Sequence, residues 1–330
     1  AALLLQAHPQ WPPAAIKSAL MTTARQDVLS SAGLRDANPF EFGSGHIVPN
    51  SANDPGLVYD VSDDEYDAFA CGVDSPAVTP QRCDELEAAG HSFGAADMNQ
   101  PAISVSKLIN TRTVQRRVTN VSENAGAYVA NIVAPQDIGV TVVPSSLSLG
   151  PGESAIFDVT LTFLGGGPLD LWRFGSLTWS SEDHDVYSPI AVKPASVLAP
   201  EQITTSGGTG TFSFAVEFGY AGPYTPAVHG LSLPRIVEAF VDNDPTKTFT
   251  FRDSNGVTQT NISVPPDQLY IRFSLFDALT DGDDDLDMYV YYCGTDGSSC
   301  RQIGQSGGPT SEEEFNVLRP AGGIYSILVH

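Results

Sequence analysis

The chain has 330 residues, which is enough for two or three domains. Its formal net charge is −23, because 39 acidic residues face only 16 lysines and arginines. This balance excludes nucleic-acid binding, which needs clustered basic side chains to neutralise phosphates. No apolar run reaches the length of a transmembrane helix, so we expect no membrane span.

The first 24 residues predict two helices. Residues 1–7 are apolar nearly all round, which suits a short helix buried inside a larger protein. Pro12 and Pro13 stand where the first turn of a second helix tolerates proline. The residues after them place one apolar stripe at helical spacing: Ile16, Ala19, Leu20 and Thr23.

A turn-rich segment follows. It reads F-G-S-G-H-I-V-P-N-S-A at 42–52 and D-P-G-L-V-Y-D at 54–60. The glycines allow a tight backbone, and the Pro and Asn residues mark turns. His46 lies in this segment, and we expect a structural role for it, because no acid–base partner can be placed beside it.

Together these segments resemble the subtilisin-like serine proteases (subtilases) of the cucumisin-like or pyrolysin-like type. In that family the nucleophilic serine opens an A-A-L-L-L helix, a P-x-x-I-K-x-A-L-M-x-T-A helix follows, and a G-x-G-x-[IV]-x-P-x-x-A-x-x-P-G-L-V-Y-D signature comes just past the catalytic domain. The resemblance implies that residues 1–60 are the C-terminal end of an α/β subtilisin-like domain. It also implies that the Asp, His and Ser of the catalytic triad all lie upstream of Ala1.

Residues 61–100 are expected to form an acidic, loop-rich linker with one short helix at 63–71, whose Y-x-x-F-x-C run belongs to the same resemblance. The four cysteines form two local pairs, Cys71 with Cys83 and Cys293 with Cys300. We predict that both pairs are disulfides of a secreted protein. A metal site is disfavoured because neither pair has C-x-x-C spacing or histidines nearby.

Residues 101–198 predict a β-sandwich. Apolar residues alternate at 138–142 and 155–163, and Gly- or Pro-rich turns separate such runs. The R-R-V-T-N-V run at 116–121 resembles the fibronectin-III-like domain that follows the catalytic domain in subtilases. Trp172 and Trp179 are expected in the core or between the sheets rather than as a platform for sugars.

Residues 199–330 predict a second β domain, with alternation at 212–218, 269–275 and 286–292. D-G-D-D-D-L-D at 281–287 and P-A-G-G-I-Y at 320–325 resemble the pre-peptidase C-terminal domain, a jelly-roll-like module whose last strand would continue past His330. The expected fold class is therefore mainly β. A helical remnant of an α/β domain is followed by a fibronectin-III-like β-sandwich and a jelly-roll-like domain.

The acidic loop of this last domain is a candidate calcium site. Hard cations bind several carboxylate oxygens within one turn. The ligands would be Asp281, Asp283, Asp285 and Glu312. The spacing fails the EF-hand pattern, because Leu286 stands where that loop needs glycine. An acidic turn that leads into a core strand is the alternative.

G-Q-S-G-G at 304–308 matches the G-x-S-x-G pattern of nucleophilic serines. We expect Ser306 to lie in a plain hairpin loop, because the nucleophile elbow requires a helix after the serine. Here an acidic run and a further strand follow. The run also resembles the G-D-S-G-G-P of chymotrypsin-like proteases, but Gln305 replaces the aspartate.

The resemblance implies the C-terminal part of a secreted, extracellular serine endopeptidase that cleaves proteins or peptides by acyl transfer. We expect no catalytic residue in these 330 residues, and the chain alone is predicted to be inactive. The chemistry needs no cofactor, so any calcium would be structural. The alternative is a non-catalytic extracellular binding or adhesion protein built of two β modules. The helices before Asn50 argue against that alternative.

Overall fold

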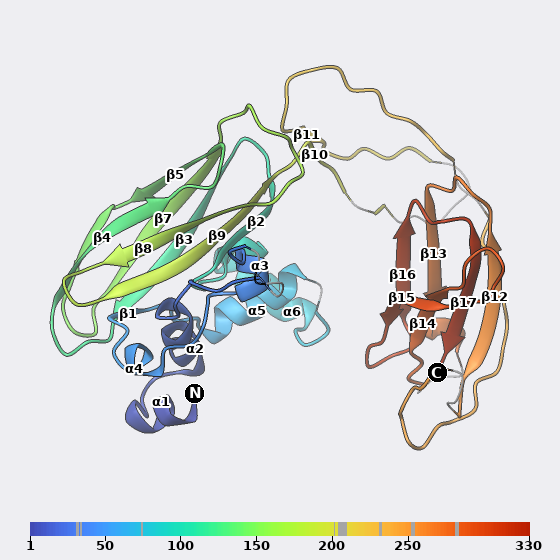
Figure 1. Ribbon diagram of the computed structural model, residues 1–330, viewed down its shortest axis with the longest axis horizontal. Coiled ribbons are helices and arrows are strands. Elements are labelled where there is room, and N and C mark those ends of the chain that lie inside the picture. Colours follow the sequence, from blue (N-terminus) through green and yellow to red (C-terminus); the bar gives the residue numbers. More distant parts are fainter. Residues whose placement is uncertain are drawn as a thin grey trace. The chain divides into compact units, whose positions relative to one another are not determined.

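The computed structural model describes residues 1–330 except 31, 32, 34, 74, 201, 204–209, 231, 232, 252–254 and 281–283. The chain divides into two compact units, Ala1–Thr225 and Pro226–His330 (Figure 1). Strands outweigh helices in both units, so the prediction of a mainly β fold is confirmed. Within the described residues no helix is long and apolar enough to cross a membrane.

The helices of the first unit begin at recognisable signals. Both predicted N-terminal helices are present, as α1 (Ala2–Ala7) and α2 (Pro13–Thr22), and α2 has proline at its first position, where no backbone N–H is needed. The helix predicted at 63–71 is α5 (Asp63–Gly72), which begins with a capping box between Ser62 and Glu65. The other helices are α3 (Pro39–Phe42), α4 (Pro49–Ala52), α6 (Pro80–Ala88) and the 3₁₀ helix η1 (Ala95–Asp97).

The acidic connector is more helical than its sequence suggested. A second helix, α6, stands where a loop was expected, because the Thr79 side chain caps it and Pro80 opens its first turn. The disulfide Cys71–Cys83 joins α5 to α6. An ion pair of 2.6 Å between Arg82 and Asp64 joins the same two helices. The connector is therefore a stapled pair of helices.

The described part of the first unit contains eleven strands. They are β1 (Leu57–Val58), β2 (Ile103–Leu108), β3 (Thr111–Asn120), β4 (Gly126–Val133), β5 (Ile138–Val143), β6 (Ser146–Leu149), β7 (Ser154–Phe163), β8 (Arg173–Ser180), β9 (Asp185–Pro194), β10 (Val197–Leu198) and β11 (Glu217–Phe218). The alternation predicted at 138–142 and 155–163 is confirmed as β5 and β7.

Nine of these strands form a sandwich of two sheets, with strand orders β1-β3-β7-β5 and β2-β9-β8-β4-β6. The pairing of β2 with β9 is parallel, and the other pairings in both sheets are antiparallel. Apolar side chains from both sheets meet between them. Trp179 is fully buried there, with its ring 5.0 Å from that of Phe157. Trp179 is therefore a core residue, as expected.

The second unit contains a four-stranded sheet of order β12-β17-β14-β15 and a two-stranded sheet of β13 and β16. Side chains of both sheets, including Phe273, Val290 and Ile327, form one core cluster. The disulfide Cys293–Cys300 spans the turn between β14 and β15. The elements are β12 (Thr258–Val264), β13 (Tyr270–Leu275), η2 (Asp277–Leu279), β14 (Met288–Tyr292), β15 (Arg301–Ser306), β16 (Glu313–Leu318) and β17 (Gly323–Val329).

The prediction of a strand at 212–218 is wrong for most of that range. Only Glu217–Phe218 forms a strand, β11, which pairs with β10. Phe212 and Phe214 are 51% and 53% exposed. Alternating apolar residues make a strand only when a neighbouring edge and an apolar face are there to receive them. The two later alternations do form strands, β13 and β14.

Candidate functional site

The two N-terminal helices pack together along one side only. Leu4 of α1, Ile16 of α2 and Ala52 of α4 form a small cluster in which each is at most 8% exposed. On the other side of α1, Leu3 and Leu5 are 78% and 49% exposed. Within these 330 residues α1 is therefore covered on one side only, and the burial expected for it inside a larger protein stays a prediction. Large apolar side chains on a helix surface are typical of an interaction face.

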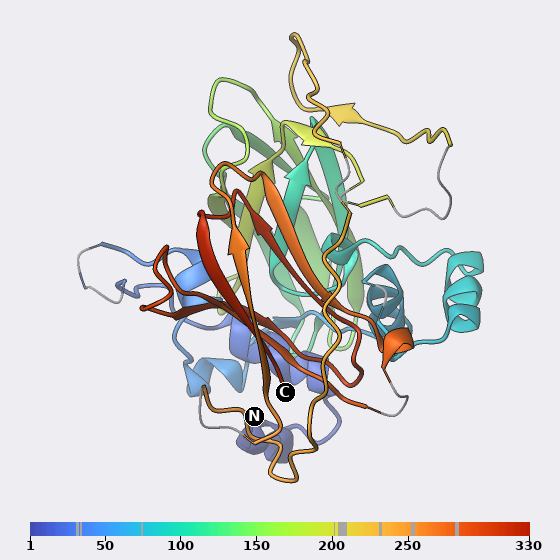
Figure 2. The same ribbon diagram turned by 90° about the vertical axis from the view of Figure 1, so that its right-hand side faces the viewer.

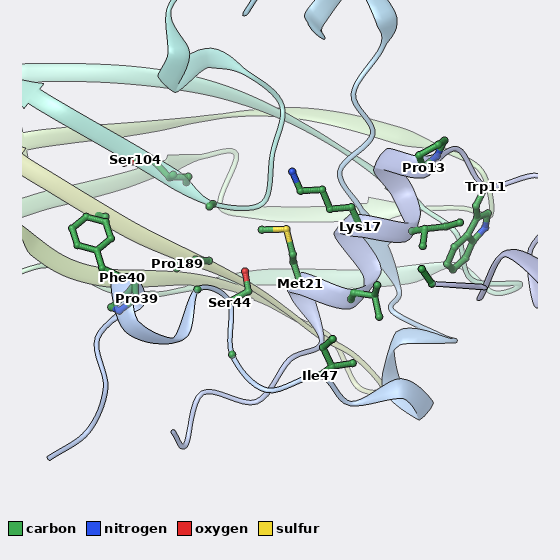
Figure 3. Close-up of a pocket in the computed structure, with 18 of the residues that line it drawn as sticks. Trp11, Pro13, Lys17, Met21, Pro39, Phe40, Ser44, Ile47, Ser104 and Pro189 are labelled. Carbon is green, nitrogen blue, oxygen red and sulfur yellow. The ribbon is translucent and has the colours of Figure 1, made fainter. Parts of the chain in front are cut away.

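An apolar groove of about 770 Å³ opens beside these helices. Figure 3 shows Trp11, Met21 and Ile47 along it, from the lead-in to α2, from α2 itself and from the turn after α3. The facing wall comes from the five-stranded sheet of the sandwich, at Ser104 of β2 and Pro189 of β9. The groove is thus built jointly by the helices and the sandwich.

The described residues that line the groove are mostly apolar and include few groups that could take part in catalysis. Among the described residues that line it, Lys17 is the one charged side chain, and there is no His, Asp, Glu or Cys. The Nζ of Lys17 donates to Oε1 of Gln100 at 3.1 Å. General acid–base or nucleophilic catalysis needs a titratable pair within hydrogen-bond reach. The groove is therefore suited to holding an apolar surface and not to catalysis.

Strand β1 attaches the helices to the sandwich. Because successive side chains of a strand point to opposite faces, Val58 packs on Ala15 and Ala19 of α2, whereas Leu57 enters the sandwich core. The backbone of β1 pairs antiparallel with β3. A segment that resembles the end of the protease domain thus supplies a strand to the β-sandwich.

Tyr59, directly after β1, is the central residue of this junction. Its backbone N–H donates to Oγ of Ser18 in α2 at 2.9 Å, and its hydroxyl lies 2.9 Å from Oγ of Ser188 in β9. The side chain is 1% exposed, and burial raises the pKa of its hydroxyl to about 12 despite the bond to Ser188. Tyr59 therefore couples α2 to the sandwich.

A buried arginine holds the connector against the sandwich. Arg116 of β3 is 2% exposed, and its guanidinium donates to the carbonyls of Gln100, Gln115, Ala96 and Ala102. Burial lowers the pKa of Arg116. Three of these carbonyls belong to the segment 96–102, so the arginine fixes that segment with the geometry that a planar fork of donors allows.

Ser306, which matches the nucleophile pattern, lies at the end of β15. Its Oγ donates to the carboxylate of Glu313, and the Glu314 amide donates to the same Oγ at 3.2 Å. The next element is strand β16 and not a helix. Ser306 is thus a strand residue paired with Met288, and β15 and β16 belong to different sheets, so the prediction of a plain hairpin loop is wrong. The strand that follows Ser306 still does not give the strand-to-helix elbow that a nucleophilic serine requires.

The calcium site stays a prediction. Asp281 and Asp283 lie outside the described residues. Of the other two candidates, Glu312 accepts a hydrogen bond from the Asp277 amide at 3.0 Å, and Asp285 precedes β14. No group of three or more His, Cys, Asp or Glu side chains in the described part of the chain is placed to hold a metal ion.

Of the three described histidines that lie near carboxylates distant in the sequence, His184 and His330 make the closest contacts, whereas His91 Nε2 is 3.8 Å from Asp64. His184 Nε2 lies 3.1 Å from Asp54, and His330 Nε2 lies 3.0 Å from Asp244. Neither contact could be read from a local motif. His46 makes a backbone bridge with Arg25, which agrees with the structural role expected for it. Within the described residues, neither His184 nor His330 has a hydrogen bond from its ring to a serine or cysteine.

Comparison with known proteins confirms the expected resemblance. Residues 97–192 match the fibronectin type-III domain family. Over 202 residues the chain is 38% identical to the subtilisin-like protease SBT5.4 of Arabidopsis thaliana, covering 59% of this chain and 26% of that protein. It is also 37% identical to SBT2.6 of Arabidopsis thaliana, covering 58% and 25%, and 36% identical to subtilisin-like protease Glyma18g48580 of Glycine max, covering 58% and 26%.

The chain thus spans about a quarter of the length of these relatives. Among solved structures it resembles the FixG-related protein from Vibrio parahaemolyticus, with a TM-score of 0.23 and 10% identity over 26% of this chain and 78% of that one. That likeness is too small to bear on function.

Proposed function

We propose that this chain is the C-terminal part of a secreted subtilisin-like serine endopeptidase. The similarity to named subtilisin-like proteases, together with a fibronectin type-III domain, supports this assignment. In the proposed enzyme the Asp-His-Ser triad is contributed by sequence upstream of the 330 residues, and it cleaves protein or peptide substrates by acyl transfer. The chain itself contributes no catalytic residue.

The observation that carries this proposal is the open apolar groove between α2 and the sandwich. It has a volume of about 770 Å³ and one charged side chain among the described residues that line it. Exposed apolar area of this kind is costly unless a partner covers it. We assign the rest of the protease domain as that partner, with Leu3, Leu5 and Ile47 in the contact.

The same proposal gives the β-sandwich a supporting role. Tyr59 and β1 attach the sandwich to α2, the helix that follows the one opened by the nucleophilic serine in subtilases. The sandwich would hold these helices in place while the upstream sequence supplies the chemistry. The two disulfides suit an extracellular enzyme, because such bonds persist in oxidising compartments.

The test compares the 330-residue chain with the product of its complete reading frame. Each protein is incubated with casein and with a fluorophosphonate probe that labels activated serines. We expect turnover and a single labelled serine, directly upstream of Ala1, in the longer product only. The variant Ser306→Ala serves as a control and should leave both results unchanged.

Two results would contradict the proposal. Labelling of Ser306 in the 330-residue chain would place the nucleophile in the second unit. A complete reading frame without a G-T-S-M-like serine motif before Ala1 would remove the protease assignment and favour the extracellular binding protein.

A further inference from the structure

Strand β12 leaves one edge of the second unit unpaired. In the order β12-β17-β14-β15 it is the first strand, and β17 is its one neighbour among the described strands. The side chains of Ile262 and Val264 pack into the core of this unit, and alternation puts Thr258 and Thr260 on the same face. The other face, with Gln259, Asn261 and Ser263, is exposed. An open strand edge presents backbone N–H and C=O groups that a further strand can bind.

A strongly apolar segment of the same unit lacks any cover. Leu233, Ile236 and Phe240 are 96%, 76% and 77% exposed, although none of them lies in a helix or strand. The stretch Arg235–Val241 reads R-I-V-E-A-F-V, which is rich in the β-branched and aromatic residues that favour strands. Exposed apolar residues in such a run indicate a segment that binds elsewhere.

Two contacts bring the end of this segment to the start of β12. The Thr258 Oγ1 donates to the carbonyl of Phe240. At Gly256 the backbone is so close to the carbonyl of Asp242 that no Cβ fits. Going from Phe240 to Asp242 moves the contact backward from Thr258 to Gly256. The segment that ends at Asp242 and the start of β12 therefore run antiparallel to each other (Figures 1 and 2).

The same two contacts define a register. Continued along β12, it places Glu238 opposite Thr260 and Ile236 opposite Ile262. Opposite residues of antiparallel strands point to the same face. Ile236 and Phe240 would then share the face on which Ile262 meets the core, whereas Val237 and Ala239 would point outward beside Asn261 and Gln259.

We propose that residues 235–241 are an edge strand that docks antiparallel on β12 of the same chain in this register. The loop that would connect this strand to β12 is held in place by Asp244, whose carboxylate lies 3.0 Å from Nε2 of His330, just after β17. That anchor favours the chain's own segment over one from a second copy. The docked strand covers the open edge and brings Ile236 and Phe240 to the face on which Ile262 meets the core. This inference does not depend on the proposed function.

Cysteine cross-linking tests the register. The double variant Val237→Cys/Asn261→Cys places two cysteines opposite each other, at a Cβ separation of about 5 Å. The matched control Ala239→Cys/Ser263→Cys shifts the pair by four residues, about 13 Å along the strand. Only the first pair meets the geometry of a disulfide. Peptide mass spectrometry under non-reducing conditions distinguishes the new bond from Cys71–Cys83 and Cys293–Cys300.

We expect the new disulfide in most of the monomeric first variant and in little of the control. Equal yields, or no bond in either variant, would overturn the proposal. A bond that forms only between copies, seen as a dimer by size exclusion, would overturn the assignment to the same chain. Amide hydrogen exchange of the unaltered chain is a second measurement, with exchange in 235–241 expected to be about tenfold slower than in 226–230. Equally fast exchange in both segments would contradict the docked strand.

Discussion

The hydroxyl of Tyr59 lies 2.9 Å from Oγ of Ser188, and both side chains are at most 1% exposed. Tyr59 follows the short strand that packs on α2, and Ser188 belongs to β9 of the sandwich. One buried hydrogen bond therefore joins the helical segment to the β-sandwich. If the two parts fold as one cooperative unit, disturbing this bond should destabilise both.

The substitution Tyr59→Phe tests this coupling. It keeps the ring that packs near Phe157 but leaves Oγ of Ser188 without its partner. A buried polar group left unpaired costs about 1–3 kcal/mol. We expect the free energy of unfolding to fall by this amount, with α2 and the sandwich still melting together. The exposed Tyr66, replaced by Phe, is the control and should change stability by less than about 0.5 kcal/mol.

Tyr59 should also make the protein sensitive to alkali. Burial raises the pKa of its hydroxyl to about 12, above the value of about 10 for an unfolded tyrosine. The unfolded state therefore releases this proton first, so stability is full below pH 10 and falls as the pH rises towards 12. One proton corresponds to about 1.4 kcal/mol per pH unit. Urea unfolding at several pH values should show a shallower decline in Tyr59→Phe, and identical slopes would contradict this assignment.

Local parts of the fold could be predicted from the sequence because their signals are local. Pro13 at a helix start, the Ser62–Glu65 capping box and the alternation along β7 each depend on residues close together in the chain. The strand predicted from the alternation at 212–218 did not form over most of that range, because an alternating pattern is also only a local signal. It states what a strand would look like, but it does not say whether a partner edge exists.

The junction and the groove could not be predicted in this way. Ser18, Tyr59 and Ser188 are brought together only by the packing of α2 on the sandwich, and no spacing rule connects them. Likewise, the sequence of α1 does not say which of its apolar residues packs on α2 and α4, where Leu4 is buried while Leu3 and Leu5 are exposed within these 330 residues. Which side of a helix is covered depends on elements that are distant in the sequence.

Arg116 should be essential for the order of the connector. Its guanidinium reaches carbonyls of residues 96–102, which would lose their partners in Arg116→Met. We expect this variant to lose about 3 kcal/mol of unfolding free energy, since several buried acceptors become unpaired together. Arg116→Lys should recover only part of the loss, because an ammonium cannot span the same acceptors.

Arg112→Met is the matched control for Arg116. Arg112 lies on the same strand but is 43% exposed in its side chain, and it forms a surface ion pair with Asp97. Such pairs contribute about 0–1 kcal/mol. Hydrogen exchange in residues 95–102 should rise in Arg116→Met and stay unchanged in Arg112→Met. Similar exchange in both variants would show that Arg116 does not hold the connector.

The second unit should weaken in acid through Asp244. The hydrogen bond from His330, followed by those from Thr246, lowers the pKa of Asp244 from 3.8 to about 2. A depressed folded-state pKa gives stability that is full above pH 4 and is lost as the pH falls towards 2. Asp244→Asn should therefore lower the melting temperature at pH 5 and flatten its change between pH 4 and 2. The exposed Asp242→Asn is the control, and an unchanged acid profile in Asp244→Asn would contradict the prediction.

Gly56 should tolerate substitution far less well than another glycine of similar backbone geometry. Its φ is +74°, and an added Cβ would lie 2.7 Å from both the Tyr128 hydroxyl and the His184 ring. Gly90 has a φ of +86° but nothing within 4 Å of that position. Both alanine variants carry the left-handed backbone cost of about 1–2 kcal/mol. Only Gly56→Ala adds overpacking, which costs about 1–3 kcal/mol more.

Urea unfolding of the two alanine variants separates these causes. Equal losses in Gly56→Ala and Gly90→Ala would show that φ alone accounts for glycine at position 56. A double-mutant cycle with Tyr128→Phe then locates the clash, because removing the hydroxyl relieves one of the two close contacts. We expect Gly56→Ala to cost less in the Tyr128→Phe background than in the unaltered chain. Gly56 lies between Asp54, which contacts His184, and β1, so this clash would disturb the attachment of the helical segment to the sandwich.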